Sequence, residues 1–432
     1  MKRIILITLA YSLCFTTWAN RDDETRTAIV KVEISPSDKI NIQAKYTELS
    51  IETWDKNEVL IEASVRFDGK MTNKIQEFLD EFESRVQNNI KKGGNELLID
   101  TDLDLPNKIQ IGSKHVGINV SYGDDDLKIS YKIKAPGKNK YTISNSYEEL
   151  RMIGSYRDVS LTQYSGELDA EYIEKANMNL KYGTATIDEI GEAKFEIYEQ
   201  ELDINEIETL DINAKYSDLE FGKTGTIDAI AYETDFIINN AKALSGNFKY
   251  GKIEIAGTLG TGEFECYELD MEIAEAGALL FTNSKYSKLR SGSVQKINYY
   301  QSYEDETRID KLDAFMSTNS KYGKHTIGKL NGPFELNAYE DEITINELGN
   351  RVDRIEIKGK YIDATIDINN SSFNLKGNVK YGKVNYDEDQ VDVRRYIKDG
   401  DQLELEIVSK NSKSSTPTEI RVDGYEIKIS LE

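Results

Sequence analysis

The sequence is poor in the residues on which most enzymes and disulfide-stabilised domains depend. Its 432 residues include two cysteines, two histidines, two tryptophans and five prolines. Cys14 lies in an N-terminal apolar segment, so a mature chain keeps only Cys266 and no intramolecular disulfide is possible. No nucleophile motif, phosphate-binding loop or zinc-ligand spacing is present, and His115 and His325 are far apart in the sequence. We therefore expect no catalytic residue, no cofactor and no metal site.

Residues 1–19 are predicted to be a signal peptide. The pair Lys2-Arg3 precedes the apolar run 4–15, and residues 17–19 (Thr-Trp-Ala) form a small-x-small cleavage site. The apolar run is too short for a transmembrane helix, and no later run approaches the roughly 20 residues that such a helix needs. We expect an exported protein, periplasmic or at the cell surface, without a transmembrane segment.

Acidic residues outnumber basic residues by 77 to 54, which gives a formal net charge of −23. A surface of this sign repels nucleic acid and anionic lipid. A long β surface also needs charge to stay monomeric, and we expect a monomer. Whether the acidic turn Asp124–Asp126 binds calcium is left open, because its carboxylates could be oxygen ligands but acidic runs arise easily in such a composition.

An apolar anchor recurs at a nearly constant spacing through residues 168–343. The step is 17 residues up to position 253 and 18 residues after it. The anchors are Leu168, Ala185, Leu202, Leu219, Phe236, Ile253, Met271, Leu289, Thr307, His325 and Ile343. A period of this kind is typical of stacked, near-identical turns. We predict an all-β, right-handed parallel β-helix, or solenoid, with rungs of 17–18 residues, the hand following the general preference for right-handed crossovers.

The two ends of the chain differ from the repeat. One amphipathic helix is predicted at about residues 72–91, because Phe78, Phe82 and Val86 follow helical spacing, and it would cap the open end of the stack. Residues 391–432 are predicted to close the other end as antiparallel β strands. The expected organisation is a signal peptide (1–19), N-terminal strands with the helix (20–140), the solenoid (141–390) and the C-terminal cap (391–432).

A second periodicity doubles the repeat. Four positions before the anchor, alternate rungs carry lysine (Lys181, Lys215, Lys249, Lys285, Lys321, Lys360, Lys380) and tyrosine (Tyr164, Tyr198, Tyr232, Tyr267, Tyr303, Tyr339). One position later the lysine rungs carry tyrosine (Tyr182, Tyr216, Tyr250, Tyr286, Tyr322, Tyr361, Tyr381). There the tyrosine rungs carry glutamate (Glu199, Glu233, Glu268, Glu304, Glu340), with Ser165 as the exception. With rungs about 4.8 Å apart, this alternation spaces like charges to roughly 10 Å.

The alternating columns have two interpretations. The first is structural: tyrosine favours β structure, fills corners and separates like charges. The second is functional: an aromatic and charged face could grip an extended polymer such as a glycan. The candidate residues for that face are Tyr182, Tyr216, Tyr250, Tyr286 and Tyr322 with Lys215, Lys249 and Lys285.

Several segments resemble one bacterial family. They are Tyr131–Pro136 (YKIKAP), the Lys-Tyr-Gly units that begin at Lys181, Lys249, Lys321 and Lys380, and the strand-like segment Ile51–Val59. In these the chain resembles the putative-adhesin family, the head-domain auto-transporter adhesin-like β-solenoids typical of Bacteroidota. The resemblance implies an exported solenoid and supplies no catalytic or binding residues. The strict two-rung repeat departs from the family pattern.

Together these features predict an adhesin-like binding or scaffold module of the cell envelope without catalysis. The partner would be an envelope protein or a glycan. The alternative is a carbohydrate-active β-helix enzyme, a lyase or hydrolase, that uses surface carboxylates.

Overall fold

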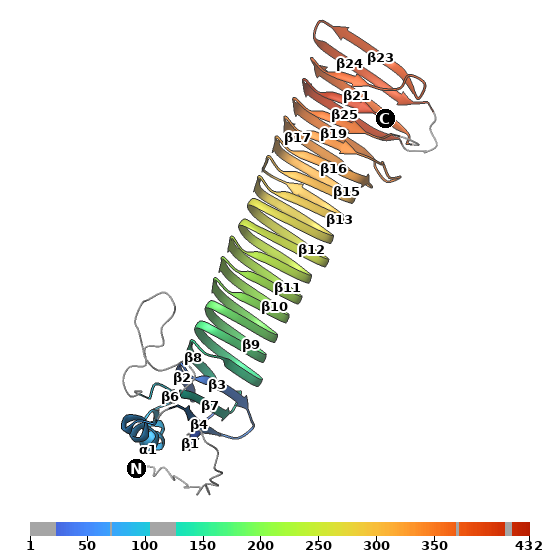
Figure 1. Ribbon diagram of the computed structural model, residues 1–432. Helices are drawn as coiled ribbons and strands as arrows, with labels where there is room; N and C mark the ends of the chain where they lie inside the picture. Colours follow the sequence, from blue (N-terminus) through green and yellow to red (C-terminus); the bar gives the residue numbers. More distant parts are fainter. Residues whose placement is uncertain (1–22, 70, 104–126, 369–370, 411–416) are drawn as a thin grey trace. The chain divides into compact units, whose positions relative to one another are not determined.

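The computed structural model describes residues 23–69, 71–103, 127–368, 371–410 and 417–432 (Figure 1). The chain divides into two compact units, Met1–Ile207 and Glu208–Glu432, and each unit is described by itself. The predicted signal peptide, His115 and the acidic turn Asp124–Asp126 lie outside the described residues.

The first unit begins with a small antiparallel sheet and the predicted helix. Strands β1 (Asp23–Glu33), β4 (Glu58–Asp68) and β7 (Leu127–Ala135) are neighbours, and each adjacent pair is antiparallel. Helix α1 (Asn73–Asn88) contacts β1, β4 and the short strand β5 (Ile90–Gly93). The Thr72 hydroxyl accepts a hydrogen bond from the Ile75 backbone N–H and so caps the helix. Phe78, Phe82 and Val86 are buried, which confirms the predicted helix and its apolar face.

Rungs appear earlier in the chain than residue 141. Strands β2 (Lys39–Lys45) and β3 (Glu48–Thr53) form one rung. On one side, β2 pairs with β6 (Glu96–Asp100) and β3 pairs with β7. On the other side, β8 (Lys140–Ser146) lies along β2, and the start of β9 (Leu150–Tyr198) lies along β3. All four pairings are parallel, so residues 39–53 already have the geometry of the repeat.

The second unit is a stack of parallel rungs, which confirms the predicted solenoid (Figure 1). Its strands include β11 (Asp218–Tyr232), β12 (Asp235–Lys285), β13 (Lys288–Tyr299), β14 (Ser302–Tyr303), β15 (Glu306–Lys321), β16 (Lys324–Leu330), β17 (Phe334–Tyr339), β18 (Glu342–Ile345), β19 (Arg354–Lys360) and β20 (Asp363–Ile366). Strand β10 (Glu201–Lys215) precedes them and ends in this unit. Leu219 pairs with Phe236 and Met271 with Leu289, so the register advances by the 17 and 18 residues read from the sequence.

The anchors lie in the core of the unit to which each belongs. Every anchor from Leu168 to Ile343 has a side chain that is at most 2% exposed. Aromatic rings also stack along the interior of the second unit, as between Phe281 and Tyr299 and between Phe315 and Phe334. Because every rung buries one face against its neighbours, stacking supplies the hydrophobic contacts that a single rung lacks.

The C-terminal end is only partly an antiparallel cap. Strands β23 (Val391–Asp399) and β24 (Gln402–Ser409) form an antiparallel hairpin on β21 (Phe373–Lys380), as predicted. The last strands, β25 (Thr418–Tyr425) and β26 (Lys428–Leu431), are instead a parallel rung. They lie between the rung β19–β20 and the rung formed by β21 and β22 (Lys383–Asn385). The prediction of antiparallel pairing was wrong for these two strands, because period-two patterning fixes the buried face but not the strand direction.

Candidate functional site

The lysine, tyrosine and glutamate columns lie at a sharp corner of each rung. In every Lys-Tyr or Tyr-Glu pair between Lys215 and Glu426 the second residue has left-handed backbone, with φ between 46° and 61°. A positive φ is uncommon for residues other than glycine. Ser165, the exception to the glutamate column, has the same conformation, with φ of 54°. We call this left-handed residue the corner residue.

Backbone hydrogen bonds hold the corners in place. Corner N–H groups donate to the next rung, as where Tyr286 donates to the Tyr303 carbonyl at 2.9 Å and Glu304 donates to the Lys321 carbonyl at 2.8 Å. The residue after the corner adds a second bond where it carries a hydroxyl. The Ser287 hydroxyl, for example, donates to the Lys285 carbonyl at 3.0 Å. These bonds keep the backbone groups satisfied in a conformation that side chains disfavour.

The tyrosines of the two columns meet in one continuous row of rings in each unit. In the second unit the row runs through Tyr216, Tyr232, Tyr250, Tyr267, Tyr286, Tyr303, Tyr322, Tyr339, Tyr361, Tyr425 and Tyr381. Neighbouring ring centroids are 5.3–5.8 Å apart and the planes cross at 69–82°. In the first unit the row runs through Tyr46, Tyr147, Tyr164, Tyr182 and Tyr198. We call each row the tyrosine stripe of its unit.

The tyrosine rings cross because they alternate, from rung to rung, between the corner position and the position before it. Tyr46 and Tyr147 both occupy the corner position of adjacent rungs, and their rings stack nearly parallel, 4.8 Å apart with planes at 14°. Tyr147 and Tyr164 occupy the two different positions, and their planes cross at 72°. Edge-to-face contact suits the aromatic quadrupole, so the two-rung repeat turns a column of like rings into a favourable ladder.

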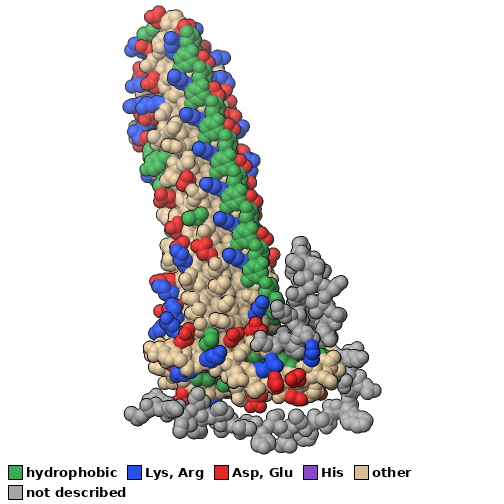
Figure 2. Space-filling view, turned by 90° about the vertical axis from the view of Figure 1, so that its left-hand side faces the viewer, with side chains coloured by type: hydrophobic (Ala, Val, Ile, Leu, Met, Phe, Trp, Pro, Cys, Tyr) green, Lys and Arg blue, Asp and Glu red, His purple; other side chains and the backbone are tan. Residues whose placement is uncertain are grey.

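Charged side chains border the stripe on both sides. The residue before the corner is lysine in alternate rungs, and the corner residue is glutamate in the rungs between. In the second unit the Lys lane comprises Lys215, Lys249, Lys285, Lys321, Lys360 and Lys380, and the Glu lane comprises Glu233, Glu268, Glu304, Glu340 and Glu426. Figure 2 shows the stripe in green, with basic side chains along one edge and acidic side chains along the other. The pairing of Lys285 with Tyr303 and of Tyr303 with Lys321 confirms the predicted alternation within one column.

The Glu lane also acts on the tyrosines beside it. A hydrogen bond with Glu233 is the main influence that raises the pKa of Tyr232. Desolvation and then the hydrogen bond with Glu304 raise the pKa of Tyr303. These phenols therefore stay protonated, as hydrogen-bond donors, to higher pH than a free tyrosine. Among the described residues, lysine ammonium groups lie over tyrosine rings at Lys45 of the first unit (5.1 Å from the Tyr46 centroid) and at Lys380 of the Lys lane (5.2 Å from the Tyr381 centroid).

The inserted C-terminal rung keeps the alternation intact. In the sequence the pairs Lys360-Tyr361 and Lys380-Tyr381 follow one another with no Tyr-Glu pair between them. In space Tyr425 lies between Tyr361 and Tyr381, with ring centroids 5.7 Å and 5.3 Å away, and Glu426 occupies its corner with φ of 48°. The last strands thus supply the Tyr-Glu rung that the sequence order lacks.

The structure brings the predicted candidate residues together within each unit. Tyr182 belongs to the stripe of the first unit. Tyr216, Tyr250, Tyr286 and Tyr322, with Lys215, Lys249 and Lys285, belong to the second unit. The five tyrosines are 39–44% exposed, so part of each ring faces solvent. The sequence revealed the second tyrosine column, but its residues were left out of the candidate face, although their recurrence one position earlier in the alternate rungs was the signal for a shared row.

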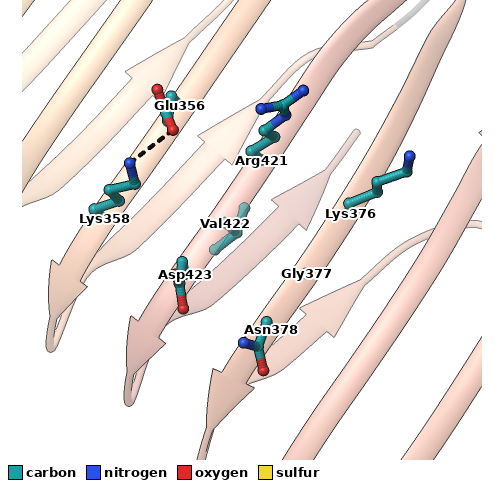
Figure 3. Close-up of a pocket in the computed structure, with 8 residues that line it drawn as sticks. All are labelled: Glu356, Lys358, Lys376, Gly377, Asn378, Arg421, Val422 and Asp423. Carbon is teal, nitrogen blue, oxygen red and sulfur yellow. Dashed lines mark ion pairs between the residues drawn. The ribbon is translucent and has the colours of Figure 1, made fainter.

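A hollow of about 340 Å³ on strands β19, β25 and β21 is a second candidate site (Figure 3). Its lining mixes the carboxylates of Glu356 and Asp423 with the basic groups of Lys358, Lys376 and Arg421. Glu356 forms a 2.8 Å ion pair with Lys358, and this hydrogen-bonded contact lowers the pKa of the carboxyl group. A general acid needs the opposite shift, so Glu356 does not suit acid catalysis of glycoside hydrolysis.

The buried reactive groups lie in the core of the second unit. Cys266 is a free, buried cysteine, and burial raises the pKa of its thiol to about 12. His325 is fully buried as an anchor, 3.5 Å from the Asp341 carboxylate, and neither of its ring nitrogens has a hydrogen-bond partner in the described part of the protein. Within that part, no three His, Cys, Asp or Glu side chains gather closely enough to hold a metal ion, and no helix is long and apolar enough to cross a membrane.

Comparison with known proteins gives distant structural neighbours. No protein-family model and no curated protein matches the chain. One similar solved structure is a "putative cell adhesion protein" from Clostridium sporogenes ATCC 15579, 10% identical, with a TM-score of 0.17 over 95% of this chain and 100% of that one. Another is a "putative lipid binding protein" from Parabacteroides distasonis ATCC 8503, 14% identical, with a TM-score of 0.21 over 80% of this chain and 98% of that one.

Proposed function

We propose that this protein is an exported, adhesin-like binding or scaffold module of the cell envelope that works by contact and not by catalysis. The observation that carries the proposal is the tyrosine stripe, a row of partly exposed rings held at a fixed spacing by left-handed corners. Tyrosine is enriched at binding interfaces because it combines apolar area with a polar tip. The signal-peptide pattern of residues 1–19 supports export.

The shape of the stripe favours an extended partner. Rings that repeat at every rung offer the same contact many times along the stack, so a polymer or an elongated protein gains affinity through many weak contacts. The carbohydrate-active alternative would need a carboxylic acid of raised pKa beside a second carboxylate, whereas the pKa of Glu356 in the hollow is lowered.

The test compares binding by a variant that loses three tyrosines of the stripe with a control that loses two exposed tyrosines outside it. Tyr216→Ser, Tyr250→Ser and Tyr286→Ser are combined in one variant. Ser165 already occupies a corner at φ of 54°, so serine is compatible with this backbone. The control combines Tyr300→Ser and Tyr396→Ser, which remove exposed tyrosines outside the stripe.

Capture of solubilised envelope components and binding to a glycan array are the measurements. We expect the stripe variant to lose binding by about tenfold or more, since aromatic contacts of this number are worth at least that factor. The control should bind as the wild type does. Equal binding by the stripe variant and the wild type would refute a role for the stripe.

A further inference from the structure

We propose that the tyrosine stripe of the second unit pairs with the stripe of a second copy of this chain, with the two copies side by side and pointing in the same direction. The inference rests on the proposed function, because both treat the stripe as a contact surface, and it names the occupant. The pairing surface is the stripe of the second unit, from Tyr216 to Tyr425.

The two charged lanes lie on opposite sides of the stripe. Lys321 and Tyr339 pair in register, so lysines and tyrosines of the position before the corner share one column. Glutamates occupy the next position along the strand, at the corner itself. Strands run across the stack axis, so one position along the chain is a step across the stripe. Basic and acidic side chains accordingly border the two edges of the stripe (Figure 2).

Because the Lys lane and the Glu lane lie on opposite edges, two copies of the stripe match in charge only when they point in the same direction. A two-fold axis parallel to the stack brings two stripes face to face and exchanges left with right. The Lys lane of each copy then faces the Glu lane of the other. If one copy is turned end over end instead, lysine faces lysine and glutamate faces glutamate. Like charges at an interface select against a wrong arrangement, so the lanes favour parallel pairing.

The alternation also places the opposite charges at interleaved heights. Lysines and glutamates occupy alternate rungs, about 4.8 Å apart. In the parallel pair, Lys285 of one copy therefore lies at a height between Glu268 and Glu304 of the second copy. Tyr286 meets the same tyrosine of the second copy near the axis, where rings can pack without a cavity. Such a contact is isologous and closes as a dimer.

Other classes of partner match fewer features of this surface. A neutral glycan would use the rings but neither lane, and a peptide would need basic and acidic side chains on opposite edges at the same double-rung spacing. A second copy supplies both features from its own repeat. The acidic composition suggested a monomer, but net charge acts over the whole surface whereas the lanes act at the contact.

The test measures the mass of the purified protein in solution across micromolar to millimolar concentrations. One variant combines Lys249→Glu, Lys285→Glu and Lys321→Glu, and a second combines Glu268→Lys, Glu304→Lys and Glu340→Lys. A control with the same net charge as the first variant combines Lys242→Glu, Lys296→Glu and Lys311→Glu, which are exposed lysines outside the lanes.

We expect wild type and control to form dimers and each lane variant alone to be monomeric, with dimerisation weakened by at least about tenfold. An equimolar mixture of the two lane variants should form a heterodimer, because over the substituted rungs an acidic stripe then faces a basic one. Circular dichroism of each variant confirms that the rungs are intact. If both lane variants dimerise as the wild type does, the lanes do not set the pairing and the inference is wrong.

A wild type that stays monomeric at all concentrations would also overturn it. In that case envelope capture decides the proposed function independently: loss of capture in the tyrosine-to-serine variant would leave the stripe as a surface for a foreign partner, and capture of a glycan or peptide would identify that partner. Mixed lane variants that remain monomers while the wild type dimerises would show that opposite charges on the lanes do not drive the pairing, and this too would overturn the inference.

Discussion

At the scale of single residues, the corners combine two properties that rarely occur together. A tyrosine or glutamate side chain sits on a left-handed backbone, which sterically suits glycine or asparagine. The ladder hydrogen bonds and the crossed rings compensate for that conformation. Mutations at a corner residue can therefore separate the contribution of backbone strain to stability from the contribution of side-chain contacts.

Tyr250 is the position at which we separate them. Tyr250→Val and Tyr250→Asn both remove the ring, but valine is β-branched and strongly disfavours φ of 57°, whereas asparagine tolerates it. We expect the valine variant to be less stable than the asparagine variant by about 1–2 kcal/mol in urea unfolding. The matched control is Tyr267, which precedes a corner. There the order should reverse, because valine favours strands. The same order at both positions would contradict the strain argument.

Asp305 gives the second prediction at this scale. Its carboxylate accepts hydrogen bonds from the Ser287 N–H and the Ser302 hydroxyl, yet burial outweighs them and raises its pKa above the ordinary value. A carboxyl whose pKa is raised on folding stabilises the fold below its unfolded pKa, and this contribution is lost as the pH rises through the folded value. Relative to Asp305→Asn, wild-type stability should therefore fall from about pH 4 upward and then level off.

The measurement is the free energy of unfolding in urea of wild type and Asp305→Asn across that pH range. The variant removes the titration and keeps the shape of the side chain, so other carboxyl groups cancel in the difference. A difference that grows in favour of the wild type as pH rises would show that the two hydrogen bonds, and not burial, control this group.

At the scale of elements, the inserted rung is the feature with the clearest energetic consequence. Ile429 in β26 pairs with Ala364 on one side and Val384 on the other, and it is fully buried. We expect Ile429→Ala to cost about 2–5 kcal/mol, because the rungs on both sides lose a contact. The control is Ile397→Ala in the hairpin strand β23, where the side chain is 45% exposed and the cost should stay within about 0.5 kcal/mol. Equal costs, measured by urea unfolding, would show that β26 does not stabilise the stack.

The same element marks the limit of prediction from the sequence. The anchors were predictable because burial repeats at a fixed period, and each one lies in the core. The placement of β25 and β26 was not predictable, because their alternation of buried and exposed residues fits parallel and antiparallel pairing equally. The sequence showed two tyrosine columns, but it did not show that their rings meet in one row. The shared row depends on the left-handed backbone of corner residues such as Tyr286. A tyrosine does not predict this backbone conformation, because tyrosine has no preference for it.

At the scale of the whole molecule, two electrostatic effects act on stability in opposite directions. Repulsion among the excess acidic residues destabilises the fold, and ion pairs between neighbouring rungs stabilise it. Exposed pairs bridge neighbouring rungs, as between Lys324 and Glu342 (3.1 Å) and between Arg290 and Asp270 (2.9 Å). Each pair of this kind contributes about 0–1 kcal/mol. Against them stands the excess of 23 acidic residues, which repel one another over distances far longer than an ion pair. Which contribution is larger determines how the protein responds to salt.

We expect added NaCl to stabilise this protein near neutral pH. Raising ionic strength from about 0.01 M to 0.15 M shortens the Debye length from about 30 Å to 8 Å, which screens the long-range repulsion and leaves contacts below 4 Å less affected. The melting temperature should therefore rise over this range and then level off. Near the isoelectric point positive and negative charges balance, so the net repulsion vanishes and the rise should disappear, which separates screening from a general salting effect. A melting temperature that falls with salt at neutral pH would show instead that the ion pairs between rungs dominate over the net charge.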